Sequence, residues 1–141
     1  MAELIKDTRH RATGWPAVFI GLLLVGAVVV VWRTVIGASD AFVARHPAQA
    51  AVAILAAAIW MLAAIGTLHN GRRMRRVAGV SWALNVVMPV VGTILPDAFI
   101  AVNPWYQAGS SYFYLTTVGA LLALGWLFYS RPAHIANRSL Q

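Results

Sequence analysis

Four long apolar stretches constrain this chain more than any other feature. A hydrocarbon core of about 30 Å needs roughly 20 apolar residues in an α-helix, and stretches of that length run over 15–36, 48–68, 77–95 and 111–129. Strands of a transmembrane β-barrel are shorter and alternate in polarity, so these unbroken runs exclude a barrel. The sequence therefore predicts an all-α polytopic membrane protein, with residues 1–141 forming one domain, a bundle of four transmembrane helices.

The composition agrees with a surface that faces lipid. Apolar residues make up 60% of the chain, charged residues 11%, and cysteine is absent. Such a composition is too apolar for a soluble domain of this size. The absence of cysteine excludes disulfides, thiolate metal ligands and cysteine nucleophiles.

The basic residues predict the orientation in the membrane. The side that would carry both termini holds nine of the 11 Lys and Arg residues: Lys6, Arg9, Arg11, Arg72, Arg73, Arg75, Arg76, Arg131 and Arg138. The other side holds Arg33 and Arg45. By the positive-inside rule, both termini are cytoplasmic and the protein lies in the plasma (inner) membrane, with rings such as Trp105 and Tyr112 at the interfaces. The net charge of +7 is thus assigned to topology and anionic lipid rather than to nucleic acid.

The two predicted outer loops share a sequence echo. Residues 40–47 read DAFVARHP and residues 97–104 read DAFIAVNP, with five of eight positions identical. One interpretation is that each loop makes a short interfacial turn, capped by its Asp and ended by its Pro. The other is that the chain contains two duplicated helical hairpins. The sequence leaves both open.

The third stretch carries the most polar side chains within a predicted span. Ser81, Asn85, Pro89 and Thr93 recur every four residues, which places them roughly along one helix face. Ser, Asn and Thr often bond between packed helices, and Pro kinks a helix. The same seam could instead line a small polar pathway beside the carbonyl that Pro89 releases. Packing is the favoured reading, and Asn85 is the best single candidate for an intramembrane functional residue.

A basic turn separates the second and third stretches. Asn70 and Gly71 are expected to stop the second helix. The residues that follow are candidates for binding anionic headgroups, at about 1 kcal/mol per basic side chain near the surface; these are Arg72, Arg73, Arg75 and Arg76.

No catalytic, metal or cofactor site emerges from the sequence. Paired acid and base catalysis needs two carboxylates within reach, and all four acids lie outside the predicted spans: Glu3, Asp7, Asp40 and Asp97. The absence of an intramembrane acid also disfavours a proton-coupled exporter of the small multidrug type. No histidine lies within a span as bis-histidine haem ligation requires, although His10, His69 and His134 could converge at the cytoplasmic face.

Two segments carry a resemblance to a known family. His69-Asn70-Gly71-Arg72-Arg73 followed by Arg76-Val77, and Leu95-Pro96-Asp97 before the aromatic start of the last stretch, resemble a family of uncharacterised small four-helix membrane proteins of actinobacteria. The likeness covers roughly the C-terminal half. It implies a Gram-positive plasma membrane and brings no assigned activity.

These features favour a non-enzymatic integral membrane protein, acting as a small accessory or structural subunit or as a homo-oligomer. Its expected partners are anionic lipids and a larger membrane protein or further copies of itself, since Ala17 with Gly21 and Gly119 with Ala123 permit close helix contact. The alternative from another class is a small-solute or ion transporter or channel that uses the seam. A membrane enzyme ranks third.

Overall fold

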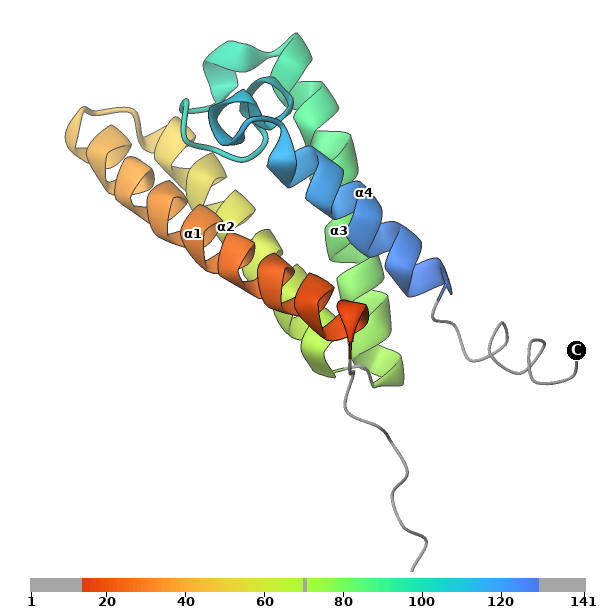
Figure 1. The fold of residues 1–141 in the computed structure, drawn as a ribbon. Coiled ribbons are helices and arrows are strands. Elements are labelled where there is room, and N and C mark those ends of the chain that lie inside the picture. Colours follow the sequence, from red (N-terminus) through yellow and green to blue (C-terminus); the bar gives the residue numbers. More distant parts are fainter. Residues whose placement is uncertain (1–13, 70, 130–141) are drawn as a thin grey trace, which may run out of the picture.

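The described part of the chain is all helical. The structure is a computed structural model, and it describes residues 14–69 and 71–129. Its elements are α1 (Trp15–Val43), α2 (Pro47–His69), α3 (Arg72–Ile94), the short 3-10 helices η1 (Pro96–Ala98) and η2 (Tyr106–Tyr112), and α4 (Leu115–Tyr129) (Figure 1). The predicted all-α class is thus confirmed.

The helices α1, α2, α3 and α4 run up and down in chain order (Figure 1). α1 packs along α2, α2 along α3 and α3 along α4, whereas α1 and α4 approach each other without packing along their lengths. One end of the molecule, here called the loop end, holds the connection 44–46 and the segment 95–114. The opposite end, here called the termini end, holds the start of α1, the turn before α3 and the end of α4.

Within the described residues, three helices are long and apolar enough to cross a membrane: α1, α2 and α3. α1 continues to Val43 rather than ending at Ile36, because the next helix-breaking residue is Pro47. α3 begins at Arg72 rather than Val77, because arginine is a good helix former and Gly71 provides an N-cap. Both differences lengthen helices that the apolar pattern had located.

The fourth predicted span is shorter as an α-helix than the sequence suggests. α4 has 15 residues and begins at Leu115, so Ser111 lies outside it. Phe113 and Tyr114 adopt positive φ angles of 54° and 61°, a conformation that interrupts a right-handed helix. η2 and α4 meet at 105° and together pass as one broken span, which would make the total four.

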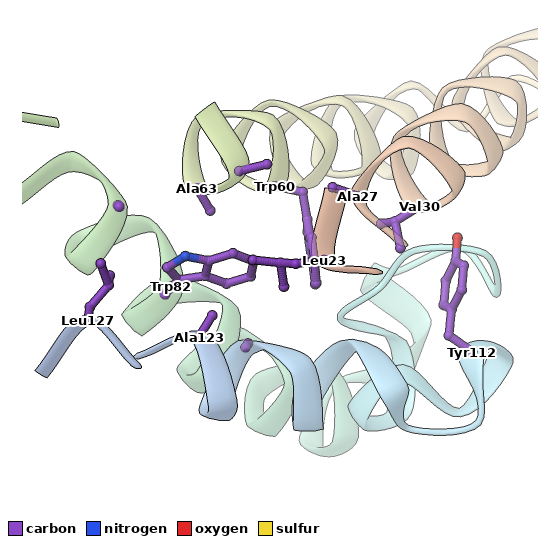
Figure 2. Close-up of a cluster of buried hydrophobic side chains, with 12 residues drawn as sticks. Leu23, Ala27, Val30, Trp60, Ala63, Trp82, Tyr112, Ala123 and Leu127 are labelled. Carbon is purple, nitrogen blue, oxygen red and sulfur yellow. The ribbon is translucent and has the colours of Figure 1, made fainter. Parts of the chain in front are cut away.

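The larger of two buried clusters lies around Trp60 and Trp82, and six of its 12 residues are alanines (Figure 2). The rings of Trp60 and Trp82 meet edge to face, with centroids 5.1 Å apart, a geometry that aromatic pairs prefer. The indole N–H of Trp82 donates to Oγ1 of Thr67 at 2.9 Å. A Cβ on Gly66 would lie 2.9 Å from Cβ of Ala78, so small residues set the close approach of α2 and α3.

The two segments of the sequence echo adopt different structures. Residues 40–43 complete α1, and Asp40 therefore lies within a helix instead of capping one. Pro47 begins α2, as expected of a proline at a first helical position. In the second segment, Asp97 lies in η1 and Pro104 is buried within the loop.

Candidate functional site

The polar seam of α3 faces the interior of the protein over most of its length. Ser81, Asn85 and Pro89 are buried. Thr93 is exposed, and its hydroxyl donates to the carbonyl oxygen of Pro89 at 2.9 Å. Three of the four seam residues are therefore buried, and the fourth, Thr93, is exposed and forms a hydrogen bond within α3.

Trp105 covers Asn85. The indole N–H of Trp105 donates to Oδ1 of Asn85 at 2.9 Å, and both side chains are 1% exposed. The backbone N–H of Trp105 donates to Oδ1 of Asn103, also at 2.9 Å. The ring of Trp105 is enclosed between the segment 95–114 and α3, and its expected place at the membrane interface stays a prediction.

The two asparagines each retain one buried donor group. Nδ2 of Asn85 and Nδ2 of Asn103 have no hydrogen-bond partner within the described residues. A buried polar group without a partner costs about 1–3 kcal/mol. These two donors are the best structural support for a polar ligand near the seam. Oδ1 of each asparagine already accepts a hydrogen bond from Trp105.

Gly92 allows the loop to lie against α3. A Cβ at this position would overlap the carbonyl oxygen of Trp105, which is backbone and has no rotamer to move. The sequence placed Gly92 beside the seam but contained no signal that a distant loop would rest on it.

A second set of contacts ties the same loop to α1 at the loop end. The carbonyl oxygen of Val102 accepts hydrogen bonds from the hydroxyls of Tyr112, at 2.7 Å, and Thr34, at 3.4 Å. The side chain of Val102 lies where a Cβ on Gly37 would be. Tyr112 is thus buried where η2, the loop around Val102 and α1 meet, and its expected place at the membrane interface stays a prediction.

Three consecutive residues of η2 have left-handed backbone angles. The φ values are 42° at Gln107, 59° at Ala108 and 80° at Gly109. A side chain disfavours this conformation by roughly 1–2 kcal/mol per residue, so two of the three positions are strained. The carbonyl oxygen of Ala108 accepts a hydrogen bond from Thr117 at 2.7 Å, which helps to hold the turn against α4.

The basic turn divides into two roles. Arg72, Arg73 and Arg76 are exposed at the start of α3. Arg75 is half-buried, and its guanidinium donates to the carbonyl oxygen of Leu127 at 2.8 Å. A cation in this position satisfies a carbonyl in the last turn of α4 and complements the helix dipole. Arg75 is therefore engaged in the fold, while the other three arginines point outward.

An apolar groove between α3 and α4 ends at this basic turn. Its volume is about 540 Å³. Arg75 and Arg76 stand at one end, and the rest of the lining is small or apolar: Gly79, Val80, Ala83, Leu124, Leu127 and Phe128. A cation above an apolar channel is the arrangement expected to suit the headgroup and chain of an anionic lipid.

Several predicted residues fall outside the described part of the chain. These are Lys6, Arg9, His10, Arg11, Asn70, Arg131, His134 and Arg138. His46 and His69 are exposed at opposite ends of the molecule. The convergence of His10, His69 and His134 therefore stays a hypothesis.

Comparison with protein-family models, with curated proteins and with solved structures finds no match for this chain. The resemblance of the C-terminal half to small actinobacterial membrane proteins stays an expectation from the residues alone.

Proposed function

We propose that this protein is a non-enzymatic, multi-pass protein of the plasma membrane that works through helix packing and contact with anionic lipid. It would serve as a small accessory or structural subunit or as a homo-oligomer, with four helices crossing the bilayer and both termini cytoplasmic. The observation that carries the proposal is the groove between α3 and α4, which ends at Arg75 and Arg76. The outward arginines beside it carry positive charge at the N-terminus of α3, which is the positive end of the helix dipole. A headgroup phosphate would interact favourably with the guanidinium groups and with the dipole.

The engagement of Asn85 supports this proposal over a pathway. Its Oδ1 accepts from Trp105, and Trp105 in turn rests on Gly92. A residue that coordinates a passing solute has to exchange partners. Asn85 would have to give up a buried hydrogen bond to do so.

The alternative function is a small-solute or ion transporter or channel. The unpartnered Nδ2 atoms of Asn85 and Asn103 favour it, because they offer two donors beside one indole. In this case the segment 95–114 would have to move away from α3 during transport. A membrane enzyme has no comparable support from the described residues.

The test is lipid retention by purified protein. The variant with Arg72, Arg73 and Arg76 all replaced by Gln spares Arg75 and hence the contact to α4. We expect it to retain less phosphatidylglycerol than the unmodified protein in native mass spectrometry, while phosphatidylcholine retention stays the same. Arg45→Gln, at the loop end, is the control. Unchanged phosphatidylglycerol retention would contradict the lipid role, and solute flux in proteoliposomes would favour the transporter.

A further inference from the structure

α1 contacts α4 toward the termini end and η2 toward the loop end, and an open groove lies between these two contacts. Toward the termini end, the rings of Phe19 and Trp126 approach with centroids 6.2 Å apart. Toward the loop end, the guanidinium of Arg33 lies 5.1 Å from the centroid of the Tyr112 ring. The groove between these contacts has a volume of about 580 Å³, within the range of small-molecule sites.

Apart from Thr116 of α4, the walls of this groove between its two ends are apolar. From α1 they are formed by residues that recur three, four and seven positions apart and so share one helix face: Phe19, Leu22, Leu23, Gly26, Val29 and Val30. α4 contributes Leu115, Val118, Gly119 and Leu122, and Trp60 of α2 also lines the groove. Figure 2 shows Leu23, Trp60 and Val30 in the part of the core that lies beside it. A Cβ on Gly26 or Gly119 would meet nothing within 4 Å, so both glycines leave room in the walls.

The loop end of the groove is positively charged. Arg33 is exposed, and no carboxylate of the described residues pairs with it. Ser111 lines the same end, where its hydroxyl donates to the carbonyl oxygen of Ala101. A guanidinium without a paired carboxylate at the end of an apolar groove favours a ligand with an anionic group and an apolar chain.

The length of the groove fits one leaflet. The 14 residue steps from Phe19 to Arg33 rise roughly 21 Å along α1, at about 1.5 Å per step. Half of a hydrocarbon core of about 30 Å is shorter than this, so an acyl chain that begins at Arg33 stays within the groove. The groove between α1 and α2 has a similar volume of about 560 Å³ but no charged residue in its lining, so it lacks this polarity.

We propose that the groove between α1 and α4 binds one acyl chain of an anionic phospholipid, with the headgroup phosphate at Arg33. The inference rests on the membrane location in the proposed function, but it concerns a different groove. Arg33 is one of two Lys or Arg residues on its side of the membrane. The proposal gives it the role of binding a ligand rather than of setting the orientation of the protein. Both grooves have arginine at one end and mainly apolar walls, as a site for an amphiphile requires. In the α1–α4 groove the arginine lies at the loop end, whereas in the α3–α4 groove it lies at the termini end.

The test is photocrosslinking of the full chain in detergent micelles with phosphatidylglycerol that carries a diazirine in one acyl chain. Phosphatidylcholine with the same chain is the comparison lipid. We expect phosphatidylglycerol to label residues 26–30 of α1 and 118–122 of α4 more than phosphatidylcholine does. Arg33→Gln should lower phosphatidylglycerol labelling roughly fivefold, the factor that corresponds to the loss of one basic residue near a headgroup, and should abolish the preference between the lipids.

A matched pair of glycine variants tests the groove itself. Gly119→Leu places a side chain in the groove and should remove labelling by both lipids, whereas Gly125→Leu adds the same side chain to an exposed position of α4 outside it. If Gly119→Leu fails to fold, Arg33→Gln still decides, because Arg33 is exposed.

Two outcomes would overturn the inference: equal labelling by the two lipids, or labelling that survives Gly119→Leu. Labelling confined to α3 and the end of α4 would leave the proposed function standing and remove only this site.

Discussion

The indole N–H of Trp105 donates to Oδ1 of Asn85, and this single buried hydrogen bond joins the segment 95–114 to the middle of α3. It uses the only amide side chain within α3 to hold a loop in place. Because Trp105 also lies against Gly92, the loop is fixed by a hydrogen bond and by close backbone packing together. The segment that follows α3 is thus part of the protein core.

The hydrogen bond between these residues can be measured with a double-mutant cycle. Asn85→Leu leaves the indole N–H without its acceptor, and Trp105→Phe leaves Asn85 without its donor. We expect each variant to lower the free energy of unfolding in detergent, and the two effects to be non-additive by ~1 kcal/mol, the scale of hydrogen bonds within membranes. Additive effects would show that the pair is not coupled. Flux of a solute that Asn85→Leu abolishes would show that Asn85 serves transport.

Close packing at Gly92 gives a second prediction. Gly92→Ala forces Cβ into the carbonyl oxygen of Trp105, so the loop has to shift away from α3. We expect a loss of about 2–3 kcal/mol in unfolding free energy, in the range of overpacked cores. The control is Gly79→Ala in the same helix, where a Cβ meets nothing within 4 Å. That variant should be neutral or stabilising by up to ~1 kcal/mol, because Ala favours the helix. Equal effects of the two substitutions would contradict the packing of Trp105 on α3.

The left-handed turn in η2 predicts a stabilising substitution. Ala108 has a φ of 59°, a conformation that glycine adopts without the penalty of a Cβ. Ala108→Gly should therefore raise unfolding free energy by up to ~1 kcal/mol, while Ala58→Gly, within α2, should lower it by a similar amount. Thermal unfolding of both variants in one detergent provides the measurement. If Ala108→Gly destabilises as much as Ala58→Gly, the backbone at this position is right-handed.

The helices could be located from the sequence because each apolar stretch is long and local. A run of about 20 apolar residues has few alternatives in a membrane, whatever it packs against. The ends of the helices could not be located from the apolar stretches, since a helix can continue past the membrane boundary. α1 accordingly continues through Asp40 to Val43.

The inward faces could not be predicted in the same way. In a helix that is apolar all round, the pattern does not distinguish the face toward lipid from the face toward protein. Trp32 is 69% exposed and Trp82 is 0% exposed, although both lie in apolar helices. The contact between Asn85 and Trp105 joins residues 20 positions apart. In the left-handed turn that follows Trp105, only Gly109 is a sequence signal. Polar periodicity identified Asn85, but its partner depended on tertiary structure.

The predicted orientation can be tested because the chain contains no cysteine. Single cysteines at Ser39, at Ser110 and at Ser139, which lies outside the described residues, are compared in sealed cells. Ser39 is exposed near the end of α1 and Ser110 is half-buried in η2, so Ser39 should react faster with an impermeant thiol reagent. We expect labelling at both and none at Ser139 until the cells are opened. Labelling of Ser139 in sealed cells would reverse the orientation.

The two roles within the basic turn predict different effects of the Arg75 and Arg76 substitutions. Arg75→Gln removes the guanidinium that donates to the carbonyl oxygen of Leu127, and with it a cation at the C-terminal end of α4. Because such contacts contribute about 1–2 kcal/mol in partly buried positions, we expect lower thermal stability of the purified protein in a neutral detergent, where no anionic headgroup is present.

Arg76→Gln is the matched control for this prediction, since Arg76 is exposed in the same turn. It should leave stability in neutral detergent unchanged and lower the stabilisation gained when phosphatidylglycerol is added. The measurement is the shift in unfolding temperature with and without that lipid. Equal loss of stability in both variants without lipid would mean that the turn acts as one structural unit, and the division between the fold and the headgroup would be wrong.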